Sequence, residues 1–136
     1  MNDRTPMLAQ PVRPPSAGRV GAYLGFFVLG AVVGVAGALV QPGWSPGGLL
    51  LALAGEAGAV LGATRVIRGR AGGVAAAAGW MLAVVLLTAS RPEGDFLFAA
   101  GSGSYLFLLG GIAVAVICAT FAPGRQPDGD AVRLAK

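Results

Sequence analysis

The sequence predicts an all-α membrane protein, a four-helix transmembrane bundle built of two antiparallel hairpins. The 136 residues are 55% hydrophobic and only 12% charged, which is about half of the charge that a soluble domain carries. The apolar residues gather in four runs, each about 20 residues or longer and so able to cross a bilayer as a helix. The connections between the runs are short, and short connections place consecutive helices side by side and antiparallel.

The chain divides into a membrane domain and two polar tails. Residues 1–18 are rich in proline, which prevents a regular helix, and are predicted to be a disordered cytoplasmic tail. Residues 19–122 are the predicted membrane domain, and residues 123–136 are predicted to be a polar cytoplasmic C-terminal tail. Within the membrane domain, the expected helices cover approximately residues 21–40, 47–66, 71–90 and 96–121.

The first run follows a basic segment and contains Ala36-Gly37-Ala38, which resembles a signal-peptide cleavage site. The apolar part of a signal peptide spans about 7–15 residues, and this run is longer. We therefore predict a retained helix, with cleavage as the alternative.

The fourth run is interrupted early by the segment GSGS, residues 101–104. Glycine weakens a helix by about 1 kcal/mol relative to alanine, so two interpretations stay open. Either one tilted helix begins near Phe96, or residues 96–100 form an interfacial turn or a re-entrant piece, as in the broken helices that line transport sites.

The basic residues predict the orientation. Ten residues are Lys or Arg, and all except Arg91 precede the first run, follow the fourth or connect the second and third. With four spans these residues fall on one side, so the positive-inside rule predicts a multi-pass membrane protein with both termini in the cytoplasm. This placement also suits contact with anionic lipid headgroups, and it does not form the basic stripe of a nucleic-acid-binding domain.

Glu56 is the candidate functional residue, because it interrupts the second run near the middle of the bilayer. An ionised carboxylate at that depth costs about 2.5–3.5 kcal/mol, so we expect a neutral acid that points into the bundle. Trp80, at the middle of the third run, is the expected hydrogen-bond donor to it. The carboxyl either holds neighbouring helices together through a hydrogen bond that contributes about 0.6–2 kcal/mol to stability, or it carries protons for a transport step.

Glycines inside the runs predict close contact between helices, since small residues let backbones approach. Gly58 and Gly62 form a GxxxG step in the second run and are expected to lie against another helix rather than lipid. The full set of expected helix-packing glycines is Gly30, Gly34, Gly55, Gly58, Gly62, Gly110 and Gly111.

Arg91, Glu93 and Asp95 lie in the predicted external loop between the third and fourth runs. A tight turn with a local ion pair worth about 0–1 kcal/mol is the simpler interpretation. The alternative is the lip of a cation or ligand site, although two carboxylates are few for such a site. The chain has no histidine and one cysteine, so we predict no metal site, no cofactor and no enzymatic activity.

Two strings carry a resemblance to a known family: QPGWSPGGLLLALAG, residues 41–55, and RPEGDFLFAAGSGSYLFLLGG, residues 91–111. With the four runs, they resemble a family of small actinobacterial integral membrane proteins whose function is unknown. The likeness covers approximately residues 20–121. It implies a four-span inner-membrane protein and brings no activity, cofactor or catalytic residue.

Together these observations predict a non-enzymatic polytopic inner-membrane protein. We expect an accessory or scaffold subunit that packs through Gly/Ala helix faces against the lipid bilayer and against other membrane proteins or itself. The alternative is a small proton-coupled transporter that uses membrane-buried Glu56, active as a homodimer. Its architecture is then analogous to the small multidrug-resistance exporters.

Overall fold

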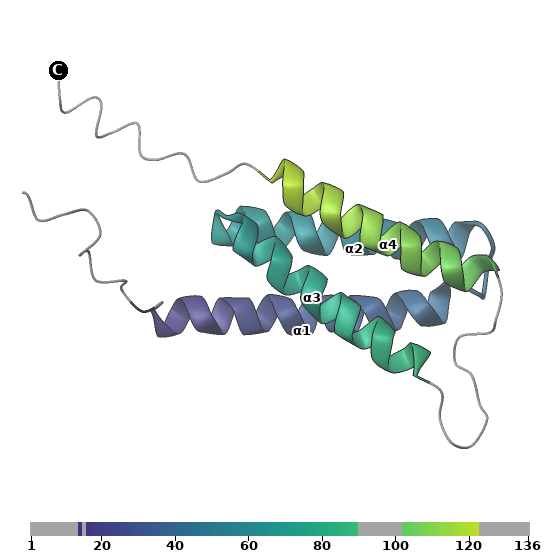
Figure 1. Cartoon of the computed structure of the whole chain (residues 1–136), viewed down its shortest axis with the longest axis horizontal. Helices are drawn as coiled ribbons and strands as arrows, with labels where there is room; N and C mark the ends of the chain where they lie inside the picture. The colour runs from purple at the N-terminus through teal and green to yellow at the C-terminus, as the bar shows by residue number, and fades with distance from the viewer. Residues whose placement is uncertain (1–13, 15, 90–101, 123–136) are drawn as a thin grey trace, which may run out of the picture.

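A computed structural model of the chain describes residues 14, 16–89 and 102–122 (Figure 1). These residues form four helices: α1 (Ala17–Val40), α2 (Gly47–Ile67), α3 (Arg70–Thr88) and α4 (Ser102–Phe121). The described residues contain no strand, and all four helices are long and apolar enough to cross a membrane. The prediction of an all-helical, multi-pass membrane protein is confirmed at this level.

Among the described residues, the helix bounds differ from the predicted ones mainly at the start of α1. α1 begins at Ala17, ahead of the predicted Gly21, because no proline follows Pro15 until the helix has ended. α4 begins at Ser102. The alternatives for residues 96–100 lie outside the described residues, as do Arg91, Glu93, Asp95 and almost all of both predicted tails.

At the α2–α3 connection, the residue that ends α2 adopts the left-handed backbone conformation. Arg68 has φ 54° and ψ 46°, and its backbone N–H donates to the carbonyl of Thr64. The N–H of Gly69 donates to the same carbonyl at 3.1 Å. Glycine is the usual residue at such a helix end, because the left-handed conformation costs other residues roughly 1–2 kcal/mol.

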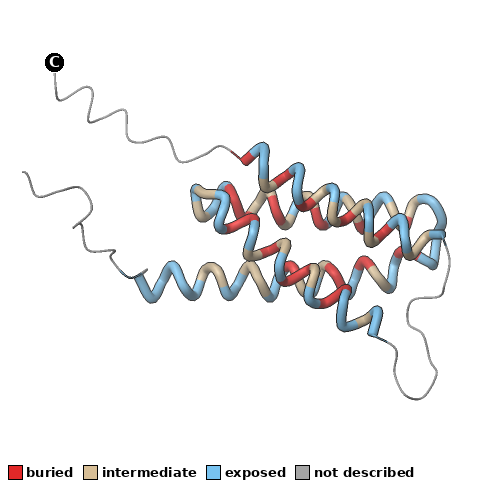
Figure 2. The backbone as a smooth tube through the Cα atoms, viewed as in Figure 1, coloured by how far each residue is buried: buried red, intermediate tan, exposed pale blue. Residues whose placement is uncertain are grey.

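The helices do not all pack equally. α1 packs most extensively against α3, which crosses it obliquely (Figure 1), while α4 lies mainly along α2 and touches α3 less. The buried residues follow the lines where the helices meet, and the N-terminal half of α1 has none (Figure 2).

Glycines bring the backbones of α1 and α3 into contact. A Cβ on Gly30 of α1 would collide with the Ala76 carbonyl of α3, and a Cβ on Gly79 of α3 would collide with the Phe27 carbonyl of α1. The two contacts are reciprocal, since each helix offers one glycine and one carbonyl. Such approach is typical of membrane helices, where close packing replaces the hydrophobic effect between segments.

Two apolar clusters fill the interior. One contains Ala52, Trp80, Val84 and Phe107, and the other contains Val60, Ala63, Ala76 and Cys118. On α2, one helical turn before Glu56 lies Ala52 of the first cluster, and one turn after it lies Val60 of the second. The acidic residue therefore sits between the two apolar clusters.

Candidate functional site

Glu56 points into the bundle, with 1% of its surface exposed. Each residue of a helix turns by about 100°, so Gly48, Ala52, Val60 and Ala63 share its side of α2, and all four are buried. Small or branched apolar neighbours above and below it leave the carboxyl facing α3 and α4.

Three helices meet at this carboxyl. A Cβ on Gly111 of α4 would lie 2.8 Å from Oε2 of Glu56 and would collide with the six-membered ring of Trp80 from α3. Trp80 is itself 1% exposed, and its ring packs against Phe107 with centroids 5.5 Å apart and planes tilted by 60°. Gly111 is thus a notch that receives both side chains, and we refer to Glu56, Trp80 and Gly111 as the carboxyl site.

The hydrogen bond predicted from Trp80 to Glu56 is not present. Within the described part of the chain, neither carboxyl oxygen of Glu56 nor Nε1 of Trp80 has a hydrogen-bond partner. The indole presents Cζ2 and Cη2 to the Gly111 notch, and its Cδ1 lies 3.3 Å from the position of a Cβ on Gly34. The structure therefore brings the two residues together at Gly111, but without a hydrogen bond between them.

No opposite charge accompanies the carboxyl in the described residues. The four described arginines, Arg19, Arg65, Arg68 and Arg70, lie at or beside helix ends and are exposed. A buried ionised carboxylate without a counter-charge or hydrogen bonds is costly. Glu56 is also the only acidic residue among those described, so this site offers a single carboxylate and not the cluster that a metal ion needs.

The predicted packing glycines separate into two groups. Gly30, Gly34 and Gly111 are buried against neighbouring helices, and a Cβ on Gly110 would meet Leu53 at 3.3 Å. Gly58 and Gly62 behave differently, because a Cβ on either would meet nothing within 4 Å in the described residues.

The expectation that Gly58 and Gly62 lie against another helix rather than lipid is therefore not met by any helix of the described bundle. The helical turn explains this result: the two glycines lie about 200° and about 240° around α2 from Glu56, so the helices that pack on the Glu56 side do not cover them. Gly55 is intermediate, since a Cβ there would reach Val33 at 3.8 Å. We call Gly55, Gly58 and Gly62 the outer glycine face of α2.

Several packing glycines were not predicted, and Gly37 and Gly79 are two of them. Gly79 makes the reciprocal contact between α1 and α3, and a Cβ on Gly37 would lie 3.0 Å from the ring of Phe107. A signal existed for Gly37, because Gly30, Gly34 and Gly37 follow the four-then-three spacing that places residues on one helix face. Gly79 had a weaker signal: it directly precedes Trp80 and therefore lies at the same depth in the third run.

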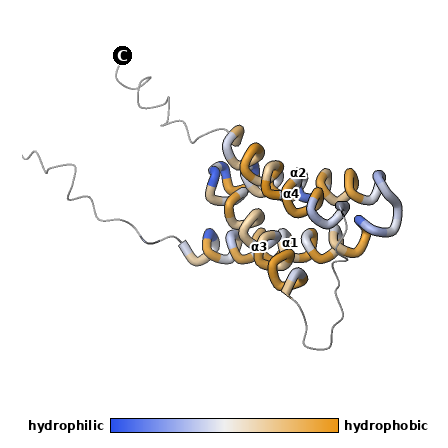
Figure 3. Tube along the Cα trace, turned by 45° about the vertical axis from the view of Figure 1, so that its right-hand side comes forward, coloured by the Kyte–Doolittle hydropathy of each residue, from blue (hydrophilic) through white to orange (hydrophobic). Residues whose placement is uncertain are grey.

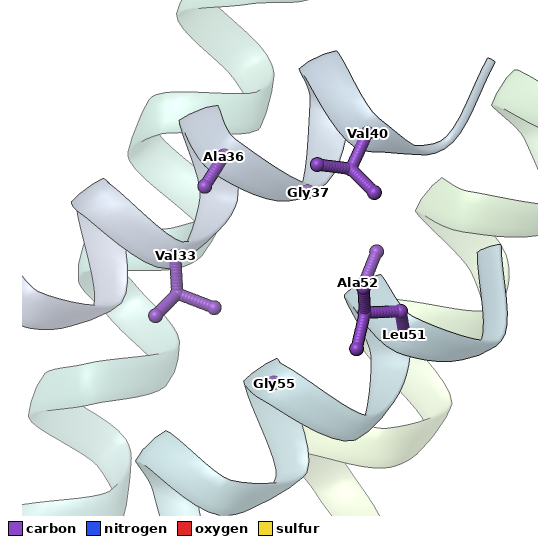
Figure 4. A pocket seen from close by; sticks show the side chains of 7 residues that line it. All are labelled: Val33, Ala36, Gly37, Val40, Leu51, Ala52 and Gly55. Atoms are coloured by element: carbon purple, nitrogen blue, oxygen red, sulfur yellow. The ribbon is translucent and has the colours of Figure 1, made fainter. Parts of the chain in front are cut away.

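An apolar groove lies between α1 and α2 on the outside of the bundle (Figure 4). It has a volume of about 260 Å³ and is lined by Val33, Ala36, Gly37, Val40, Leu51, Ala52 and Gly55. The small residues at its floor prevent the two helices from filling the space between them. Because Gly55 belongs to both, the groove continues into the outer glycine face.

Comparison with known proteins places the chain in a family. No curated protein and no solved structure matches it. One family matches residues 7–135, which include both strings that carry the resemblance and all four helices. With nearly the whole length matched, this chain belongs to the family of unknown function DUF6113.

Proposed function

We propose that this chain is a non-enzymatic inner-membrane protein that serves as an accessory or scaffold subunit. The observation that carries this proposal is the outer glycine face of α2, whose Gly58 and Gly62 have no neighbour within 4 Å among the described residues. In lipid, small residues on an outward face allow a second helix to approach backbone to backbone. The partner is a helix of another membrane protein or of a second copy.

The proposal includes two antiparallel hairpins with both termini in the cytoplasm. Its support is that the chain runs from left to right along α1 and α3 and from right to left along α2 and α4 (Figure 1). In Figure 3, hydrophilic segments lie where α1 begins, where α2 joins α3 and, at the other end of the bundle, between α1 and α2. The described arginines lie only at the start of α1 and at the α2–α3 turn, and an excess of arginine is typical of the cytoplasmic side.

Cross-linking in native membranes tests the role of the outer glycine face. In a Cys118→Ala background, Gly58→Cys places the only thiol on this face, and Ala78→Cys places it on the exposed side of α3 as the matched control. We expect mild oxidation or a short bifunctional reagent to give one discrete adduct with Gly58→Cys and none with Ala78→Cys. The mass of the adduct then distinguishes a second copy from a different protein.

A competing substitution makes this test stricter. Gly58→Leu adds a bulky side chain to the proposed contact, and Ala78→Leu adds one to the control face. If the scaffold proposal holds, Gly58→Leu removes the adduct formed through a neighbouring Gly62→Cys, whereas Ala78→Leu preserves it. Equal adducts from both faces, or none from either, would contradict the proposal.

A second candidate function is proton-coupled transport through Glu56, which is supported by a buried carboxyl with no described hydrogen-bond partner. Infrared difference spectroscopy of the protein in nanodiscs tests it, with Glu56→Gln identifying the carboxyl band. Transport requires that the band titrate between about pH 5 and about pH 9, where a side chain can exchange protons at working pH. A band that stays constant over this range rules out proton coupling and leaves a structural carboxyl.

A further inference from the structure

The turn between α2 and α3 carries a positive charge that nothing in the described residues balances. Arg65, Arg68 and Arg70 fall within six residues and are all exposed. The only described acidic side chain is Glu56, and it is buried in the bundle. Three neighbouring guanidinium groups without a carboxylate predict a partner that supplies the negative charge.

The backbone of Arg68 supports a role for its side chain. Arg68 occupies the left-handed position that ends α2, at φ 54°. Glycine takes this conformation without strain, and Gly69 is the very next residue. The chain therefore has an arginine at a position where glycine would make the turn more stable. Strained positions that persist are frequently functional.

Exposed apolar side chains adjoin the arginines. Val66, next to Arg65, is 70% exposed, and Val74, one turn beyond Arg70, is 54% exposed. Leu82 continues the same side of α3, two turns further along, and is 46% exposed. A ligand that satisfies this surface has an anionic group at one end and a hydrocarbon chain that leads away from it. A nucleic acid or a free phosphate ion would satisfy the arginines alone.

We propose that the α2–α3 turn binds the phosphate of an anionic phospholipid headgroup through Arg65, Arg68 and Arg70, with an acyl chain along Val74 and Leu82. Arginine suits this task, because its planar guanidinium can hold two phosphate oxygens at once. This site is distinct from the outer glycine face and does not depend on the scaffold role.

Lipid selection by the purified full chain tests the proposal. Protein in a mild neutral detergent is mixed with equal amounts of phosphatidylglycerol and phosphatidylcholine, and the retained lipids are counted by native mass spectrometry. A basic residue that lies close to an anionic headgroup contributes about a fivefold preference for that lipid, so the triple variant Arg65→Gln, Arg68→Gln, Arg70→Gln, which removes all three arginines of the proposed site, should lose a preference of about a hundredfold. The triple lysine variant should keep most of it, because it keeps the charge.

Two single variants provide sharper controls. Arg19→Gln removes a described arginine outside the turn and should leave the preference unchanged. Arg68→Gly should raise the thermal unfolding midpoint in neutral detergent, because glycine relieves the left-handed strain, while it lowers the preference about fivefold. Opposite changes in stability and lipid selection cannot come from general misfolding. These single variants also carry the test if the triple glutamine variant does not purify.

Several outcomes would overturn the proposal. They are equal retention of the two lipids by the wild-type chain, a preference that survives the triple glutamine change, and a loss with Arg19→Gln as large as with Arg68→Gly. Competition by inorganic phosphate or by a short DNA duplex at the concentration at which lipid competes would also overturn it. Either result would show that the arginines recognise the anion without its acyl chain.

Discussion

Gly111 faces the Trp80 ring and the Glu56 carboxyl too closely to carry a side chain. We predict that Gly111→Ala lowers the free energy of unfolding by about 1–3 kcal/mol, the usual cost of overpacking. The matched control is the neighbouring Gly110→Ala, whose Cβ would meet only the flexible end of Leu53. Denaturation in mixed detergent micelles measures the free energy of unfolding of both variants. An equal loss of stability in the two would contradict the close packing of Trp80 and Glu56 against Gly111.

A second prediction concerns the stability effect of replacing the buried carboxyl of Glu56. Methionine has a similar length and needs no hydrogen bond, so Glu56→Met should raise the free energy of unfolding by about 1 kcal/mol. Glu56→Ala leaves a cavity instead and should lower it by about 2 kcal/mol. Loss of stability in Glu56→Met would reveal a polar partner of the carboxyl outside the described residues.

The sequence could predict that Glu56 is deep and inward, since run length gives its depth and the helical period gives its face. It could not predict the orientation of the Trp80 indole. That orientation depends on the notch at Gly111 and on the approach of Gly34, which come from two other helices. The neighbouring residue Trp80 was therefore identified, and its hydrogen bond to Glu56 was predicted incorrectly.

Among the helices, the closest contact is the reciprocal one between α1 and α3. Gly79→Ala would push a methyl group into the Phe27 carbonyl, and Gly30→Ala would push one into the Ala76 carbonyl. We expect each substitution to lower the free energy of unfolding by about 1–3 kcal/mol, which a fall in the thermal unfolding midpoint would report. Gly58→Ala serves as the control, and it should be neutral or stabilising by about 0.5–1 kcal/mol, because alanine favours the helix and nothing lies in its way.

Helix faces were harder to predict than helices. The apolar runs indicated four helices because a lipid environment leaves a long apolar segment few other structures. Nearly every side of each run is apolar or small, however, so the pattern that separates core from surface in a soluble helix is weak. α2 shows the result: its inward face was identified by Glu56, whereas its outer glycines meet no helix within the described bundle.

Orientation belongs to the whole molecule. We predict that a cysteine at Ser45, between α1 and α2, reacts with a membrane-impermeant thiol reagent applied to intact cells. A cysteine at Arg68 should react only after the membrane is permeabilised. Both follow from the placement of arginine on the cytoplasmic side. Reaction of Arg68→Cys in intact cells would reverse the proposed topology, and Cys118→Ala provides the thiol-free background.

The fold class could be predicted because it depends on properties summed over the chain, namely the length of the apolar runs and the shortness of the polar connections. The arrangement could not, because it depends on which glycine meets which carbonyl. The dominance of the α1–α3 contact over the contacts between consecutive helices is such a case.

The meeting of Glu56 and Trp80 at Gly111 has a consequence for biosynthesis. A ribosome releases α1, α2 and α3 before α4, so the first three helices enter the bilayer while the notch that receives the carboxyl is still in the exit tunnel. During that interval the side of Glu56 that α4 will cover faces lipid or the insertion machinery. Insertion of α4 then completes the burial of the acid, so the assembly of these four helices waits for the helix that carries Gly111.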